Sequence, residues 1–427
     1  MTTKKLPEIL DIIYSFEKKM GQSLEENPSF KTSIDYLLLL YYLSYYEQDE
    51  QQSNYYFQKG RSQFIQLFKH LSFQSTPLGV WYGHSMLGYL SLVYFEEDEQ
   101  RKFKDQLNSF IKVQCEKMIH SYDWKDNGMF SGFYDMISGI SGIGVYFINQ
   151  KNLDREFIQM LTQWVIQIIQ PEIGIQGYFL EGFYIPKDKI TNPQFKMKYT
   201  NGYIDMGLSH GVAGCLYFLV KAKELKIEES LLSESIFLLI QYYKKLLKKN
   251  QLGFLESPTV LKKNDENQFE PQYFPRLSWC YGLLGILRVL YLTKESNDDS
   301  ELQYLIENEL NKISLGNASD FSLECPTFCH GYSGLLYILH LFQTENNQID
   351  LHYKIDELEQ IIWESASNDY PFYFRKIDRN PETNEEFVQL DNLSAIDGVT
   401  SIIIPYLIMN ACREIKKDIF SEALFLV

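Results

Sequence analysis

The sequence predicts an all-helical fold, a closed ring of helical hairpins built from an internal repeat. Segments such as 153–169, 229–247 and 301–315 space apolar residues three and four apart, which is typical of amphipathic helices. Between such segments lie shorter stretches that are apolar on every side, and most of them follow a G-x-x-G turn. A helix that is apolar all round is a buried helix, so the alternation indicates an inner layer covered by an outer layer.

The inner-helix candidates follow one another along the whole chain. The first, at 34–46, is apolar but lacks the glycine pair. Complete G-x-x-G turns precede four others, at 139–142, 211–214, 282–285 and 331–334, and partial copies stand at 85–88 and 398–401. With an amphipathic helix between neighbours, this makes seven inner helices. The repeats are unevenly spaced, which favours a closed ring over an open solenoid.

The glycines are expected to act by close approach. Without Cβ atoms, the first turns of neighbouring inner helices can crowd together, and glycine also permits unusual φ/ψ angles in the preceding turn. Because every inner helix then begins at the same end of the ring, the loops before these helices converge there. We expect a functional site at that end.

Two stretches interrupt the helical pattern, 171–202 and 251–275. They hold most of the Pro and Asn residues, together with short aromatic and β-branched runs. We interpret them as strands and long loops that form a small β-containing lobe over one face of the ring. The whole chain, residues 1–427, is otherwise expected to be one domain.

Charge and cysteine content exclude several classes of protein. A formal net charge of -16 argues against a nucleic-acid partner, which would need a basic face. Glu8 and Asp11 stand where a secretory signal would be apolar, and no apolar run approaches the roughly 20 residues of a bilayer span. Six cysteines in 427 residues are not a disulfide framework. We therefore expect a cytoplasmic protein with reduced thiols, in which clustered cysteines are ligands or nucleophiles.

Three residues with metal-binding side chains directly precede the glycine turns of two consecutive repeats. Cys280 comes before Gly282, and Cys329 with His330 comes before the next such turn. Two thiolates and one imidazole suit Zn²⁺ and leave a fourth tetrahedral position open, as in catalytic zinc sites. Cys325 is a rival ligand, but it lies outside the shared register and precedes a proline.

An acid–base pair is predicted in the same register. His210 directly precedes Gly211, and Asp135 stands four residues before Gly139. The carboxylate would fix the tautomer of an imidazole that faces the metal. The alternative is that Asp135 caps its helix and His210 is a core residue.

Taken together, these motifs resemble the lanthionine synthetase C family of lanthipeptide cyclases. The resemblance rests on Asp135 with SGISG at 138–142, GLSHG at 207–211, WCYG at 279–282 and CHGYSG at 329–334. It covers nearly the whole chain in the family's order. It implies an α,α-toroid of seven inner and seven outer helices, a small extra lobe, and one Zn²⁺ per chain at the mouth of the ring.

The resemblance also implies roles for individual residues. Zinc would be held by Cys280, Cys329 and His330, with acid–base work by Asp135 and His210, and with Arg276 and Tyr281 lining the pocket. The family adds Cys thiols of a precursor peptide to dehydroalanine or dehydrobutyrine, which closes thioether rings. Arg276 and Tyr281 would stabilise the enolate that this addition leaves, and His210 would act as the acid or as the base.

The implied partners are a dehydrated precursor peptide with its leader, a dehydratase, and an export transporter at the inner face of the membrane. Two other hypotheses remain open at this point. One is zinc-dependent addition of glutathione or another free thiol to an electrophile on the same scaffold. The other is a non-catalytic scaffold of a synthetase complex, although a scaffold has no use for an open metal position.

Overall fold

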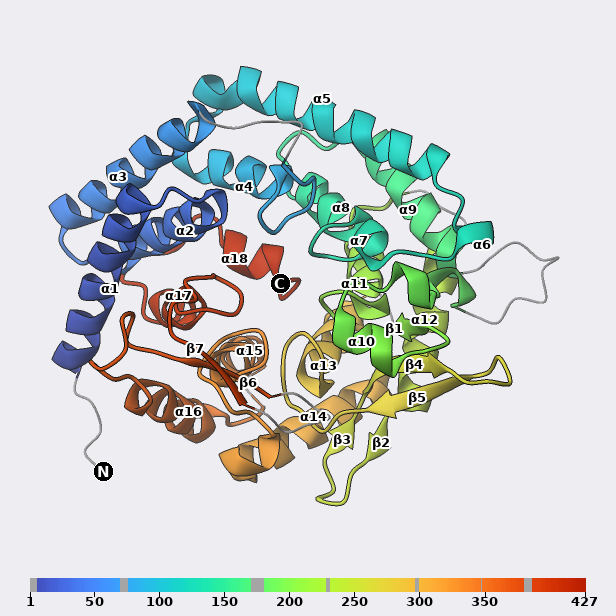
Figure 1. Cartoon of the computed structure of the whole chain (residues 1–427). Helices are drawn as coiled ribbons and strands as arrows, with labels where there is room; N and C mark the ends of the chain where they lie inside the picture. Colours follow the sequence, from blue (N-terminus) through green and yellow to red (C-terminus); the bar gives the residue numbers. More distant parts are fainter. Residues whose placement is uncertain are drawn as a thin grey trace.

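Two concentric rings of helices build the molecule, as Figure 1 shows. The computed structural model describes residues 6–69, 76–169, 180–227, 231–295, 299–346, 348–379 and 386–427. The inner helices are α2 (Phe30–Tyr46), α4 (His84–Tyr94), α8 (Ile140–Ile148), α11 (Val212–Glu224), α13 (Leu283–Leu292), α15 (Tyr332–Glu345) and α17 (Thr400–Met409). The outer helices are α1 (Leu6–Glu26), α3 (Glu50–Lys69), α5 (Glu97–Ser121), α9 (Arg155–Ile169), α12 (Leu232–Leu246), α14 (Ser300–Leu315) and α16 (His352–Glu364).

The ring closes on itself. Each inner helix packs against the next one along the chain, and α17 packs against α2. Nearly every side chain of α4, α8 and α13 is buried, whereas α9 buries one stripe that includes Phe157, Leu161 and Trp164. The predicted toroid of seven inner and seven outer helices is confirmed for the described residues.

The glycines of the repeat act differently from the prediction. A Cβ on the second glycine would lie 2.0 Å from the Met136 carbonyl oxygen at Gly142 and 2.1 Å from the Trp279 carbonyl oxygen at Gly285. These carbonyls belong to the loop of the same repeat rather than to a neighbouring helix. The first glycine of each complete turn has extended backbone, so unusual φ angles are not the reason for glycine there. The glycines let each loop fold tightly onto the first turn of its own helix.

The C-terminal segment fills one end of the ring, a feature that the repeat did not predict. Helix α18 (Ile419–Ala423) lies inside the inner layer, where its apolar side chains and those of residues 424–426 are fully buried. Two side chains of the ring donate hydrogen bonds to backbone carbonyl oxygens of this C-terminal segment. Trp279 Nε1 donates to the Leu424 oxygen at 3.0 Å, and Arg288 Nε donates to the Leu426 oxygen at 2.6 Å.

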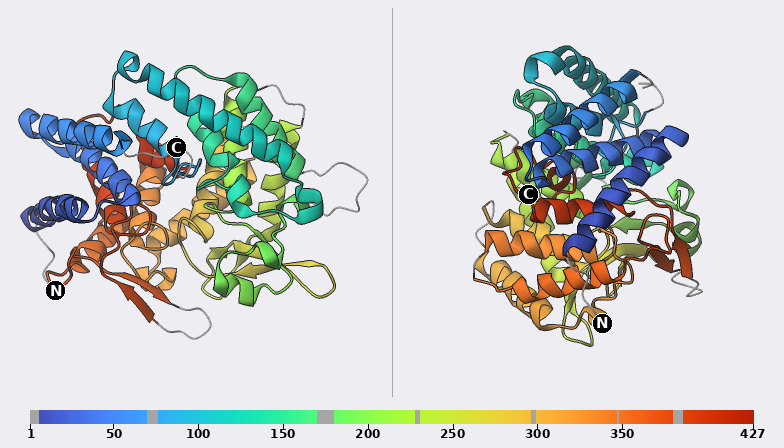
Figure 2. Two further views of the ribbon diagram at one scale, coloured as in Figure 1. Left: turned by 45° about the horizontal axis from the view of Figure 1, so that its top comes forward. Right: turned by 90° about the vertical axis from the view of Figure 1, so that its left-hand side faces the viewer.

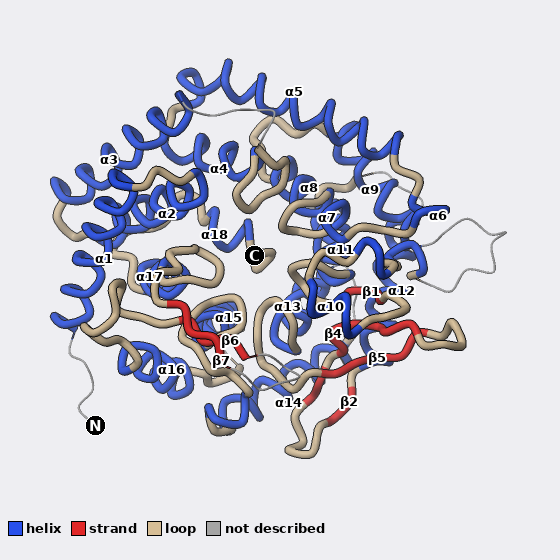
Figure 3. Tube along the Cα trace, viewed as in Figure 1, coloured by secondary structure: helices blue, strands red, loops and turns tan. Residues whose placement is uncertain are grey.

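Short strands form three small sheets among the described residues, as Figure 3 shows. An antiparallel sheet has the order β1-β4-β5, with β1 (Tyr203–Asp205), β4 (Pro258–Lys263) and β5 (Phe269–Tyr273). Strands β4 and β5 lie within the predicted insertion 251–275, while β1 begins just after the predicted end at 202. Residues 171–179 of the other insertion lie outside the described residues. Helix α10 (Pro193–Lys198) and the 3₁₀ helices Glu181–Phe183 and Lys187–Lys189 complete this part of the molecule.

Two further strand pairs were not predicted as such, although the second strand of the first pair lies within the predicted insertion 251–275. They are β2 (Lys248–Lys249) with β3 (Leu255–Glu256), and β6 (Lys376–Arg379) with β7 (Glu386–Gln389). The right-hand view of Figure 2 shows β6 and β7 projecting from one side of the ring. The remaining short elements are α6 (Trp124–Asn127), α7 (Ser131–Tyr134) and the 3₁₀ helices Thr293–Glu295 and Ala318–Phe321. Among the described residues, none of the helices is both long and apolar enough to cross a bilayer.

Candidate functional site

Backbone hydrogen bonds join the loops that precede the inner helices. The Leu208 amide donates to the Cys280 oxygen at 3.0 Å, the Cys280 amide to the Cys329 oxygen at 3.3 Å, and the Cys329 amide to the Ile396 oxygen at 2.9 Å. Equivalent bonds run from Trp81 to Ile137 at 3.1 Å and from Met136 to Ser209 at 3.3 Å. Each loop is thus held in a fixed register against the next, and together the loops form the mouth of the ring.

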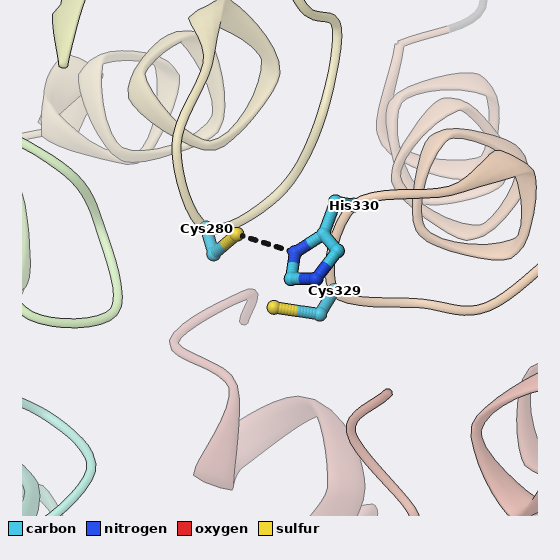
Figure 4. A group of neighbouring side chains, drawn as sticks. All are labelled: Cys280, Cys329 and His330. Carbon is cyan, nitrogen blue, oxygen red and sulfur yellow. Dashed lines mark hydrogen bonds between the residues drawn. The ribbon is translucent and has the colours of Figure 1, made fainter. Parts of the chain in front are cut away.

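This register brings the three predicted metal ligands together. Cys280 and Cys329 each stand two residues before the first glycine of their turns, and His330 follows Cys329. Cys280 Sγ lies 3.2 Å from His330 Nδ1, and the ligand atoms of the three residues all lie within 4.8 Å of one another. Figure 4 shows the three side chains pointing toward a common centre from two loops. In the part of the chain that the structure describes, no other group of three or more His, Cys, Asp or Glu residues has such an arrangement.

The donor set fits Zn²⁺. Two sulfur atoms and one imidazole nitrogen are the ligands that zinc prefers, and three protein ligands leave room for a fourth. Burial raises the pKa of the Cys280 thiol, but the hydrogen bond with Cys329 and the neighbouring His330 ring together lower it well below its usual value. The rival Cys325 is not part of the group, and its sulfur lies 3.1 Å from the Thr327 hydroxyl.

Asp135 and His210 form the predicted pair. His210 Nδ1 donates to Asp135 Oδ2 at 2.6 Å. The other carboxylate oxygen, Oδ1, accepts from the amides of Ser138 at 2.7 Å and Gly139 at 3.0 Å. Asp135 therefore caps the turn before α8 and accepts a hydrogen bond from His210 at the same time. The Asp135 side chain is 2% exposed, whereas that of His210 is 40% exposed.

Carboxylates around His210 keep its ring charged at neutral pH. Burial of the ring lowers its pKa, but the hydrogen bond to Asp135, the charges of Asp135 and Asp205, and the nearby Cys280 outweigh burial and raise the pKa to about 9. The resting state is therefore an imidazolium that can donate a proton.

Asp205 is a site residue that the sequence reasoning missed. It ends β1, is 1% exposed, and accepts a hydrogen bond from the Tyr281 hydroxyl at 2.7 Å. The half-buried Tyr281 ring lies between two others, with its centroid 6.4 Å from those of His210 and Phe195. The available signal was a carboxylate five residues before His210, although it stands six residues before Gly211 whereas Asp135 stands four residues before Gly139.

Arg276 is not joined to the other site residues by a hydrogen bond. Its guanidinium lies 5.0 Å from the centroid of the Phe274 ring, and its buried Nε atom has no hydrogen-bond partner among the described residues. Its positive charge contributes to the lowered pKa of the Cys280 thiol. The guanidinium thus remains available to an anionic group that enters the mouth.

The fold and the donor set define a helical toroid with a candidate zinc centre beside a hydrogen-bonded histidine–aspartate pair. Residues 36–413 match the family described as lanthionine synthetase C-like protein, and the chain belongs to that family. This confirms the family that the sequence motifs indicated.

Two individual proteins illustrate the relationship. The chain is 26% identical over 210 residues to the nisin biosynthesis protein NisC of Lactococcus lactis subsp. lactis, a match that covers 48% of this chain and 48% of that protein. The match thus spans about half the length of that curated relative. A solved structure of a nisin cyclase superimposes with a TM-score of 0.77 at 19% identity, covering 97% of this chain and 98% of that chain. The structural likeness shows a shared fold.

Proposed function

We propose that this protein is a zinc-dependent peptide cyclase that forms lanthionine and methyllanthionine rings. It would add Cys thiols of a dehydrated precursor peptide to dehydroalanine or dehydrobutyrine in the same peptide. The observation that carries the proposal is the Cys280–Cys329–His330 group at the mouth of the ring, beside a charged His210. Membership of the family supports the same class of reaction.

Cys280, Cys329 and His330 would hold one Zn²⁺ per chain. A bound zinc ion would lower the pKa of the incoming peptide thiol, which ordinarily ionises near 8.5, so that the thiolate is present at neutral pH.

His210 is the proton donor in this proposal. When the sulfur bonds to the β-carbon, the electron pair of the C=C bond moves toward the neighbouring carbonyl and leaves an enolate. The His210 imidazolium then gives its proton to the α-carbon. The proton that the thiol released into solvent is later replaced on His210, which returns to its charged form. Asp135 positions the ring through Nδ1 and keeps it charged, which leaves Nε2 to face the peptide.

Arg276 would stabilise the negative charge that develops on the enolate oxygen, because its guanidinium has no carboxylate partner among the described residues. Tyr281 differs from the expectation. Its hydroxyl donates to Asp205, so its hydrogen is not directed at the enolate.

The proposal extends to partners and location. The peptide would arrive with its leader from a dehydratase and leave through an export transporter, and the reaction would take place in the cytoplasm. None of the six cysteines forms a disulfide, as expected of thiols in a reducing compartment.

Zinc content measured beside cyclisation tests the proposal. Wild type, Cys280→Ala and Cys325→Ala would be analysed for zinc and then incubated with a dehydrated precursor peptide whose free thiols are counted by alkylation and mass spectrometry. We expect about one zinc per chain and ring closure in wild type and in Cys325→Ala, a matched buried thiol close to the site. Cys280→Ala should lose both. Zinc that is absent, or unaffected by Cys280→Ala, would contradict the proposal. Addition of glutathione without ring closure would favour the free-thiol alternative.

A further inference from the structure

We propose that Asp205 is a positioning residue, which fixes the Tyr281 hydroxyl so that its oxygen can only accept a hydrogen bond from the bound peptide. The inference rests on the proposed function and names a contact that the peptide makes. Its basis is the direction of one hydrogen bond.

A tyrosine hydroxyl has a single hydrogen to donate. In this structure Tyr281 donates it to Asp205 Oδ2 at 2.7 Å. An ionised carboxylate has no hydrogen of its own, so the direction cannot reverse while Asp205 is charged. The remaining lone pairs of the phenol oxygen can be satisfied only by a donor. A peptide in the mouth offers such donors as backbone N–H groups, including those that flank the dehydrated residue.

Asp205 uses its two oxygens for different partners. Oδ1 accepts from the Gly207 amide at 2.9 Å, which shapes the loop before α11, and Oδ2 accepts from Tyr281. An asparagine has only one acceptor oxygen. If it kept the bond to Gly207, its amide nitrogen would turn toward Tyr281, and Tyr281 would become the acceptor in that pair with its own hydrogen released. Both bonds as they stand therefore require a carboxylate at position 205.

Another buried aspartate shows that this requirement is specific. Asp35 is 2% exposed and also accepts from a tyrosine hydroxyl, that of Tyr82 at 3.0 Å, and from a backbone amide, that of Ala395 at 2.9 Å. Both bonds end on the same oxygen, Oδ1, so an asparagine can keep them. Asp35→Asn is thus a matched control for Asp205→Asn.

Charge offers a competing explanation, because Asp205 also faces His210, together with Asp135 and Cys280. Removing its charge could weaken the acid directly. A double-variant cycle separates the two effects: an action through Tyr281 disappears when the Tyr281 hydroxyl is absent, whereas an action through His210 persists.

The test compares wild type, Asp205→Asn, Tyr281→Phe, the double variant and Asp35→Asn. Zinc content, melting temperature, kcat and KM for ring closure are measured for each. We expect Asp205→Asn and Tyr281→Phe each to lower kcat at least 10-fold with zinc retained. The double variant should be no slower than Tyr281→Phe alone, and Asp35→Asn should match wild type in kcat, KM and zinc content.

Full activity in Asp205→Asn would overturn the inference, and so would an equal fold-loss from Asp205→Asn in the Tyr281→Phe background. If Asp205→Asn does not fold, Tyr281→Phe decides, because it leaves the bond to Gly207 in place, and wild-type kcat in that variant would overturn the inference. Failure of wild type and Asp35→Asn to close rings would instead overturn the proposed function, and with it the role of Asp205.

Discussion

The mouth of the ring has two sides that share one backbone design and differ in chemistry. The metal side consists of the loops before α8, α11, α13 and α15, and the closing side consists of the start of α2 with the loops before α4 and α17. On both sides a buried aspartate accepts a hydrogen bond from the hydroxyl of a tyrosine that lies just before an inner helix. The pairs are Asp205 with Tyr281 and Asp35 with Tyr82. The thiols and His210 occur only on the metal side. The aspartate–tyrosine hydrogen bond therefore joins neighbouring elements on both sides of the mouth. Only on the metal side does it lie beside thiols and an imidazole that could take part in a reaction.

The ionisation of the two aspartates shows the effect of these surroundings. Burial raises the pKa of Asp35 to about 8, since the hydrogen bonds from Ala395 and Tyr82 only partly oppose it. Burial also raises the pKa of Asp205, but only to about 6, because the positive charge of His210 lowers it. At neutral pH Asp205 is thus mostly a carboxylate and Asp35 mostly an acid. The cation beside Asp205 keeps the metal side charged.

Removal of the His210 side chain should cause the largest loss of activity on the metal side. We expect His210→Ala to lower kcat for ring closure about 10²–10⁴-fold, the range for loss of a general acid, with zinc retained. His120→Ala, on the exposed face of α5, is the control and should be unchanged. Ring closure by His210→Ala at the wild-type rate would rule out the acid role.

Asp135→Asn tests whether the charge of Asp135 raises the pKa of His210 on the metal side. A raised pKa means that the favourable charge on His210 contributes to stability below its unfolded value of 6.5 and is lost as pH rises through about 9. Without the Asp135 charge, we expect the pKa of His210 to fall toward 6.5. NMR titration of metal-free protein should show this, and the alkaline limit of activity should move to lower pH. A His210 pKa that stays near 9 in the variant would contradict this assignment of the cause.

Glycine substitutions test whether the two sides share their backbone design. A Cβ would lie 2.2 Å from the Arg276 oxygen at Gly282, on the metal side, and 2.4 Å from the Asn392 oxygen at Gly398, on the closing side. We expect both alanine variants to lose about 1–3 kcal/mol of unfolding free energy, the usual range for overpacking, as measured by denaturant titration. Only Gly282→Ala should also weaken zinc binding, because it displaces the loop that carries Cys280. Equal zinc affinity in the two variants would show that the metal ligands do not depend on this turn.

The sequence predicted the metal side better than the closing side, for physical reasons. Cys280, Cys329, His330 and His210 stand at fixed positions before a glycine pair, and a repeat places equivalent positions side by side. The role of Asp205 depends on β1 and on a hydroxyl from the next repeat, so no local pattern marks it. The C-terminal residues from Ile419 onward were also missed, because they pack across several repeats and carry no glycine turn. The predicted purpose of the glycines was wrong for the four complete turns, whose glycines approach the loop of their own repeat. The pattern does not encode how that loop folds.

Asp35→Asn is the smallest effect we expect and the one that isolates the closing side. The pKa of Asp35 is raised to about 8 in the folded protein. The contribution of protonated Asp35 to the free energy of unfolding is therefore complete below its unfolded pKa of 3.8 and is lost as pH rises toward 8. The variant keeps both hydrogen bonds to its amide oxygen but has no proton to lose. It should match wild type near pH 4 and exceed it near pH 9 by on the order of 1 kcal/mol in unfolding free energy. Asp11→Asn, on the exposed face of α1, should show no such divergence. If Asp35→Asn and wild type kept the same stability difference at both pH values, Asp35 would be ionised throughout, and the electrostatic contrast between the two sides of the mouth would be lost.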